Sequence, residues 1–323
     1  MFKKILLLIQ NQKNPTHIGG QAVIEGVMMR DKDRYSIAVR LPNAEIETVI
    51  KQIKPSRAIF KKPFFRGVKA LIENLQIGYQ SLQWSADKME DKPENEKKDK
   101  KSILDSLSVL FSILVAVGLF IVLPNLLIEF FNLSEKEHPV LFNLASGGIR
   151  LSIFTLYVLG ISFIKDVKRI FQYHGAEHKV IHAFEDGLSL NYENVKKFTT
   201  LHKRCGTSFV FLLIFVSILL FSLVPPVLKT LFPGVLNLSF AFYKIIIFLS
   251  HLVLLPVLGA FSYEVLKLSA KGNWIGKSLS FLALPGLFFQ KITTKEPDEK
   301  QVEVAVAALQ ILLDTQKKES AAS

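Results

Sequence analysis

Three of the seven histidines lie four residues apart in one short stretch: His174, His178 and His182. A helix advances about 100° per residue, so this spacing puts the three imidazoles on one face, and Glu185 returns to that face after about three turns. The pattern His174-x-x-Glu177-His178 is also the inverted zincin arrangement, in which two imidazoles bind a metal and the glutamate acts as a base. The stretch therefore predicts a divalent-metal site with Glu177 as its catalytic residue.

Further side chains can complete the coordination of such a metal. His202 and Cys205 lie three residues apart later in the chain. A site of imidazoles with one thiolate or carboxylate favours zinc, with iron and manganese as alternatives. On an ideal helix Glu177 is about 60° from His174, at the edge of the metal-facing stripe. The candidate third ligands are polar residues of this neighbourhood, with one more distant carboxylate: His182, Glu185, His202, Cys205 and, further away, Glu264.

Simpler interpretations of the same residues remain open. Histidines can be solvated or can pack without a ligand, and a buried network of histidines and carboxylates can hold loops together without a metal. Cys205 can be an ordinary buried small residue. Because Lys203 and Arg204 precede it, Cys205 can also be a reactive thiolate.

Long apolar stretches make up much of the remaining chain. Half of the 323 residues are hydrophobic, and the mean hydropathy is +0.31. Four stretches approach the roughly 20 residues that a helix needs to cross a bilayer, although the second includes Arg150 near its start. They predict an α-helical polytopic membrane protein in which residues 102–323 form the membrane domain. The predicted transmembrane helices lie near residues 103–129, 142–164, 208–228 and 241–264.

The distribution of basic residues predicts the orientation of these helices. The loop 165–207 and both ends of the chain are rich in lysine and arginine, which predicts that the histidine loop and both termini are cytoplasmic. The net charge of +12 is then explained by basic residues beside the membrane helices, where they contact anionic lipid. No nucleic-acid partner is expected. The single cysteine excludes an intrachain disulfide framework.

The segments outside the membrane helices have their own patterns. Residues 1–86 predict a small cytoplasmic α+β region, with a hairpin at 35–41 and 45–53 and an amphipathic helix from Gly67. A charged linker is predicted at 87–101. Two elements are predicted after the last membrane helix: an interfacial segment at 275–290 and a C-terminal amphipathic helix at 297–317.

Four sequence blocks carry a resemblance to a known family: Gly19–Arg30, His174–Lys179, His202–Phe209 and Pro285–Pro297. With these blocks in this order, the chain resembles the YqhQ-like family of bacterial membrane proteins, which is described as a family of metal-dependent enzymes. Lys203 departs from the family pattern, which has proline after the histidine. The resemblance implies a multi-pass protein of the bacterial cytoplasmic (inner) membrane with a polar site on the cytoplasmic side, and it implies no substrate.

Two classes of function follow from these patterns, beside the purely structural network. The first is a membrane-embedded metal-dependent hydrolase. The second is a non-enzymatic assembly factor, metal sensor or small transporter, which His251 in the middle of a membrane helix and the prolines of these helices favour. Besides the lipid bilayer, the expected partners are another protein or a second copy of the chain.

Overall fold

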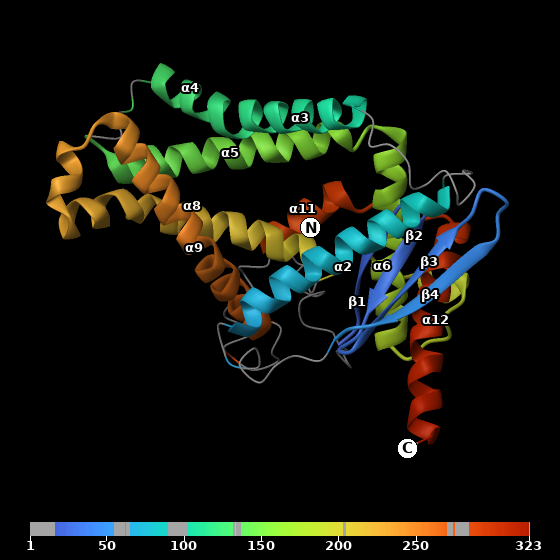
Figure 1. Ribbon diagram of the computed structural model, residues 1–323. Helices are drawn as coiled ribbons and strands as arrows, with labels where there is room; N and C mark the ends of the chain where they lie inside the picture. The colour runs from blue at the N-terminus through green and yellow to red at the C-terminus, as the bar shows by residue number, and fades with distance from the viewer. Residues whose placement is uncertain are drawn as a thin grey trace. The chain divides into compact units, whose positions relative to one another are not determined.

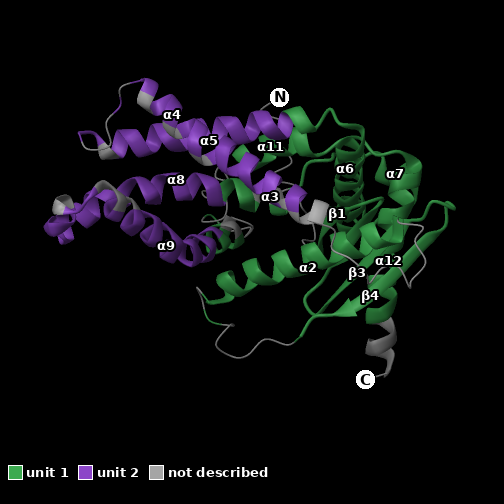
Figure 2. Cartoon of the chain, turned by 45° about the horizontal axis from the view of Figure 1, so that its top comes forward, with its two compact units in different colours: residues 1–91, 160–212, 263–323 green, residues 92–159, 213–262 purple. Residues whose placement is uncertain are grey.

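The computed structural model describes residues 17–54, 62, 65–89, 103–131, 133, 137–202, 205–269, 274 and 284–322 (Figure 1). The chain divides into two compact units (Figure 2). Unit 1 combines Met1–Asp91, Gly160–Leu212 and Tyr263–Ser323, and unit 2 combines Lys92–Leu159 and Leu213–Ser262. Unit 1 thus joins the N-terminal segment, the histidine loop and the C-terminal segment, whereas the predicted domains group the last two with the membrane helices. Most of the predicted linker, residues 90–101, lies outside the described residues.

Unit 1 is built on a four-stranded antiparallel sheet in the order β1-β2-β3-β4. The predicted hairpin forms β3 and β4, whose register pairs Ile37 with Val49. The glycine-rich block before it forms a second hairpin, which the sequence analysis did not predict. The strands are β1 (Gly19–Val23), β2 (Gly26–Arg30), β3 (Arg34–Arg40) and β4 (Ile46–Gln52).

The alternation of side chains along the strands gives the sheet two buried faces. One face presents Val27, Met29 and Ala38 to helices α6 (Lys165–Glu185) and α12 (Glu299–Ala322). The other presents Met28 and Ile37 to α2 (Phe65–Met89), the predicted amphipathic helix. The sheet therefore lies between α2 on one side and α6 with α12 on the other (Figure 1).

The tight turn between β1 and β2 attaches the sheet to α6. Val23 pairs with Gly26, so the turn has two residues, and Glu25 adopts a left-handed φ of 50°. Its carboxylate accepts a hydrogen bond from Nε of Arg169 at 2.5 Å and another from the hydroxyl of Tyr173 at 3.3 Å. Because both donors lie on α6, these contacts hold edge strand β1 against the helix that carries the histidines.

Two further helices of unit 1, α7 (Tyr192–Val195) and α11 (Leu284–Thr293), complete the surroundings of α6. The predicted interfacial segment 275–290 falls partly outside the described residues. Its described part belongs to α11, where Leu287, Phe289 and Gln290 are buried. Pro285 occupies the first turn of this helix, where the missing N–H is tolerated, so it begins a helix instead of breaking one.

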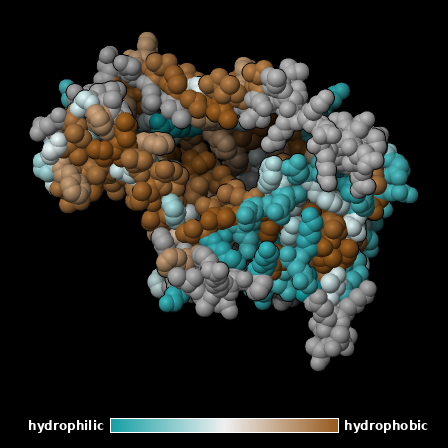
Figure 3. Space-filling view, in the orientation of Figure 1, coloured by the Kyte–Doolittle hydropathy of each residue, from teal (hydrophilic) through white to brown (hydrophobic). Residues whose placement is uncertain are grey.

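Unit 2 contains long apolar helices. Three helices of the described chain are long and apolar enough to cross a membrane, over Val140–Ile161, Phe209–Leu231 and Ile245–Val265. They correspond to the last three predicted crossings, and many of their large hydrophobic side chains are exposed (Figure 3). The elements are α3 (Ile103–Val117), the π-helix η2 (Gly118–Val122), α4 (Leu123–Phe130), α5 (Pro139–Ile161), α8 (Gly206–Leu231), the 3-10 helix η3 (Pro233–Asn237) and α9 (Phe240–Ser269).

The first predicted crossing, near 103–129, has a different structure. Residues 103–130 are helical, but the π turn η2 separates α3 from α4, so neither α-helix has the length of a membrane span. Within it, Leu110–Phe120 forms a shorter apolar helix. The described residues thus support three membrane-spanning helices, and a fourth remains a prediction.

Candidate metal centre

Helix α6 carries the predicted histidines in a buried position. Nearly all of its residues from Tyr173 to Glu185 are buried, because the sheet, α12 and the loop after α7 surround it. The helix ends at Glu185, and Gly187 then adopts a left-handed φ of 73°, which glycine favours after a helix. The reversal of the chain there allows Thr200, Leu201, His202 and Cys205 to lie along the histidine face.

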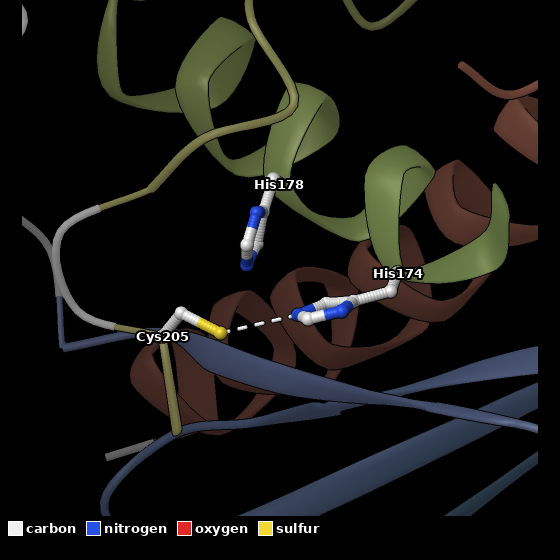
Figure 4. A group of neighbouring side chains, drawn as sticks. All are labelled: His174, His178 and Cys205. Atoms are coloured by element: carbon white, nitrogen blue, oxygen red, sulfur yellow. Dashed lines mark hydrogen bonds between the residues drawn. The ribbon is translucent and has the colours of Figure 1, made fainter. Parts of the chain in front are cut away.

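His174, His178 and Cys205 form the first group of possible ligands. One donor atom of each lies within 4.8 Å of the other two, and all three residues are buried. Nε2 of His174 is 3.1 Å from Sγ of Cys205. The ring of His178 points into the space beside that pair (Figure 4), and its centroid is 4.5 Å from that of His174. Two imidazoles and one thiolate are a donor set that suits zinc and leaves a coordination position open.

Backbone carbonyls fix the tautomer of both histidines. Nδ1 of His174 is 2.8 Å from the carbonyl oxygen of Thr293, and Nδ1 of His178 is 2.5 Å from that of Thr200. A carbonyl oxygen can only accept a hydrogen bond, so each Nδ1 carries the proton and each Nε2 keeps its lone pair. Metal-binding histidines adopt this arrangement: one ring nitrogen binds the metal, and the other donates a hydrogen bond to a neighbouring oxygen atom.

Glu177 lies beside the first group, on the same turn of α6. Its Oε2 is 3.9 Å from Nε2 of His178, and within the described residues neither atom has a hydrogen-bond partner, although both are buried. Burial raises the pKa of Glu177 to about 8 and lowers the pKa of His178 to about 4, so both groups favour their neutral forms. Buried polar atoms without partners are rare and costly, so this pair marks a place where a ligand would be stabilising.

Gly20 explains how Glu177 reaches the histidine face. The backbone N–H of Gly20, on edge strand β1, donates a hydrogen bond to the Glu177 carboxylate. A Cβ at Gly20 would lie 2.6 Å from the carbonyl oxygen of Met28 and 2.8 Å from Cγ of Glu177, so only glycine fits here. Apart from its place in a glycine-rich block, nothing in the sequence marks Gly20 as part of the site.

Gly175 permits a second close approach. A Cβ there would collide with the carbonyl oxygen of Lys295 and would lie 3.2 Å from Cγ2 of Thr200. The backbone N–H of Lys295 donates to the carbonyl of Phe171 at 2.8 Å. Because Thr293 and Thr200 supply the carbonyls that hold His174 and His178, this glycine lets both supporting segments lie against α6.

His182, Glu185 and His202 form the second group. One donor atom of each lies within 4.8 Å of the other two, with His182 half-buried and the other two buried. Nε2 of His202 is 3.6 Å from Oε2 of Glu185, and the ring centroids of His182 and His202 are 4.6 Å apart. The structure thus divides the six predicted ligands between two adjacent groups of three.

Gln290 on α11 holds the backbone at His202. Its Oε1 accepts from the N–H of His202 at 2.8 Å, and its Nε2 donates to the carbonyl of the same residue at 2.8 Å. Gln290 is fully buried, so both ends of its amide are satisfied within the protein. Sequence reasoning gave Gln290 no role, because nothing local links it to a histidine 88 residues earlier.

Two other polar residues from the sequence analysis lie elsewhere. Glu264, the more distant candidate ligand, accepts from Nε of Arg66 at 2.5 Å and is engaged in that ion pair. His251 belongs to unit 2, where its ring stacks on Phe221 with centroids 4.1 Å apart. Neither belongs to the two groups of ligands.

Comparisons with known proteins add a family context. A family profile described as "Protein of unknown function (DUF1385)" matches residues 62–315, a range that includes both groups. The chain is also 36% identical over 319 residues to a protein of Bacillus subtilis (strain 168) named "Uncharacterized protein YqhQ", with 94% of this chain and 95% of that protein covered. No solved structure matches the chain.

Proposed function

The chain belongs to the YqhQ-like family, and from its apolar helices and its buried histidine site we propose that it is a membrane-embedded metal-dependent hydrolase. Its site lies on the cytoplasmic side of the bacterial inner membrane, where the basic loop 165–207 favours retention. The membrane helices would keep this site close to substrates that lie in or beside the bilayer.

One observation carries the proposal. Oε2 of Glu177 and Nε2 of His178 lie 3.9 Å apart in a buried position, neither is bonded to a described nitrogen or oxygen atom, and the group that Nε2 of His178 faces is the thiol of Cys205. A purely structural network would pair these atoms with each other or with neighbours. An imidazole lone pair and a carboxylate oxygen that both face one space are instead what a site for a cation and a water molecule requires.

His174, His178 and Cys205 would hold the cation, because their donor atoms are close together and the tautomers of both histidines are already set. A divalent metal bound there would act as a Lewis acid and lower the pKa of a coordinated water molecule towards neutrality. Its positive charge would also favour the ionised form of Glu177.

Glu177 would act as the general base. Its Oε2 would accept a proton from the water molecule as the oxygen attacks a carbonyl or phosphoryl centre, and would return that proton to the leaving group. The N–H of Gly20 would hold the carboxylate in place through this transfer. Burial would keep bulk water from competing for the proton.

The proposal can be tested with the full-length protein in detergent and in liposomes. We expect wild-type protein to retain zinc, His174→Ala with His178→Ala to lose the ion of this site, and Glu177→Gln to keep it. Extracts of bacterial lipids and membrane peptides, incubated with the liposomes, should yield products that have gained one water molecule. Glu177→Gln should form them at least about 100-fold more slowly, the usual contribution of a general base.

Two results would reject this function. Unchanged metal content in the double histidine variant would exclude His174 and His178 as ligands. Equal product formation by wild type and Glu177→Gln would exclude the glutamate as base. If metal binding is retained but no extract component is hydrolysed, a metal sensor or assembly factor becomes the better description.

A further inference from the structure

We propose that the chain binds a second divalent cation, held by His182, Glu185 and His202 one helical turn beyond the first group. This site goes beyond the proposed hydrolase chemistry, which needs only the first group and Glu177. The two positions are adjacent, since the ring centroids of His178 and His202 are 5.5 Å apart.

The distance between the two buried donors supports a bound cation. Nε2 of His202 and Oε2 of Glu185 are 3.6 Å apart, which exceeds the roughly 2.7–3.2 Å of a hydrogen bond with nitrogen. Two donors that bind one tetrahedral cation at about 2.1 Å lie about 3.4 Å from each other. The observed separation therefore fits two ligands of one ion better than a hydrogen-bonded pair.

Burial also favours binding of a cation. The side chains of His202 and Glu185 are only 3% and 4% exposed. The attraction between a carboxylate and a divalent cation is stronger in such a water-excluded place than in solvent.

Hydrogen bonds to the backbone position the ligands of this second group, as they do in the first group. Nε2 of His182 donates to the carbonyl of Leu201 at 2.9 Å, which leaves the lone pair on Nδ1. The ring of His182 also stacks on Phe198 at an interplanar angle of 10°. Gln290 holds both backbone groups of His202. Two of the three ligands are thus positioned before any ion binds.

The donor set also predicts which cations bind. Two imidazoles and a carboxylate lack the soft sulfur that Cys205 gives the first group, so this site should accept Mn²⁺ or Fe²⁺ as well as Zn²⁺. The first group, with a thiolate, should discriminate more strongly in favour of zinc.

Cobalt distinguishes the two sites by spectroscopy. We would titrate untagged, metal-free, full-length protein in detergent with Co²⁺ and record its absorption. Only a site that contains Cys205, the single cysteine, can give thiolate-to-cobalt charge transfer, whereas both sites give d–d bands. We expect the charge-transfer band to saturate after one equivalent and the d–d bands after two.

Variants assign each ion to its site. Glu185→Gln should reduce the endpoint from two equivalents to one and keep the charge-transfer band. Cys205→Ser should remove that band and keep the d–d bands of the second site. Glu193→Gln, a change at an exposed residue of α7, should leave the endpoint at two and serves as the matched control.

The inference is overturned if wild type saturates at one equivalent, a result that does not depend on how any variant folds. It is also overturned if both wild type and Glu185→Gln bind two ions. Failure of the proposed function is a separate result, because it appears as unchanged charge transfer and metal content in His174→Ala with His178→Ala.

Discussion

At the scale of single residues, the site depends on atoms whose hydrogen bonds are directed by the backbone. Backbone carbonyl groups accept hydrogen bonds from Nδ1 of His174 and His178 and so keep the proton on that nitrogen, and a strand N–H holds Glu177 beside them. The rigidity of such a site comes from its supporting residues, and two of them can be tested directly.

Gly20→Ala should destabilise the protein and displace Glu177. The new Cβ would lie 2.6 Å from the carbonyl oxygen of Met28, and a backbone atom cannot move aside cheaply. We expect a loss of about 1–3 kcal/mol, as for other overpacked sites, measured by thermal unfolding in detergent. Gly19→Ala is the control, because nothing lies within 4 Å of a Cβ there. Equal stability of the two variants would contradict the proposed role of Gly20.

Gln290→Ala should weaken the support of His202. The substitution leaves the N–H and the carbonyl of His202 without their partner in a buried place, at a cost of about 1–3 kcal/mol for each group. Unfolding should occur at lower temperature, and Co²⁺ affinity should fall more at the second site than at the first. Gln76→Ala, an exposed change on α2, should alter neither quantity. A loss of affinity restricted to the first site would show that Gln290 acts elsewhere.

At the scale of elements, α12 shows how an amphipathic helix finds its surface. The sequence predicts such a helix at 297–317, and the structure extends it over Glu299–Ala322 against α6 and the sheet. The hydroxyl of Ser36 on β3 also donates to the carbonyl of Ala308 at 2.6 Å. The C-terminal segment therefore closes the core of the unit that carries the histidines.

Leu309→Ala tests whether α12 stabilises this core. Leu309 is fully buried, and removing its side chain should cost about 2–5 kcal/mol through lost burial and the cavity left behind. Limited proteolysis should then cut the chain between α11 and α12 faster than in wild type. Gln310→Ala, at the neighbouring exposed position, should leave the cleavage rate unchanged. Protection of the Leu309→Ala protein equal to that of wild type would contradict this packing.

At the scale of the whole molecule, the chain combines apolar helices with a polar unit assembled from three separate stretches. The three stretches that form unit 1 pack into one compact body. One described helix of membrane-spanning length, Val140–Ile161, separates the first stretch from the second, and two separate the second from the third. A common cytoplasmic side, which the basic residues of the loop 165–207 and of both chain ends predict, therefore requires the fourth predicted crossing near 103–129.

Reporter fusions can test this orientation in bacterial cells. Fusions after the connection at 186–190 and after residue 323 should give fluorescent GFP and inactive alkaline phosphatase, because both sites are expected in the cytoplasm. A fusion within Pro233–Asn237 should give active alkaline phosphatase, since the two flanking helices are long and apolar enough to cross the membrane. Active alkaline phosphatase after the connection at 186–190 would place the candidate metal site outside the cytoplasm.

The sequence by itself determined the features that depend on neighbours along the chain. Apolar length predicted three helices that the structure contains, alternation predicted the hairpin of β3 and β4, and the spacing of four predicted that His174, His178 and His182 share a face of α6. These features follow from the rise and rotation per residue of helices and strands, so they require no knowledge of the fold.

Only the tertiary structure decided which distant residues meet that face. Five candidates stood for the third ligand, and the packing of the segment after α7 against α6 placed Cys205 with one pair of histidines and His202 with His182 and Glu185. Gly20 and Gln290 became part of the site because edge strand β1 and α11 pack beside it. Such contacts depend on how separate elements bury their apolar faces together. The periodicity of one segment does not indicate which other segment its apolar face will contact.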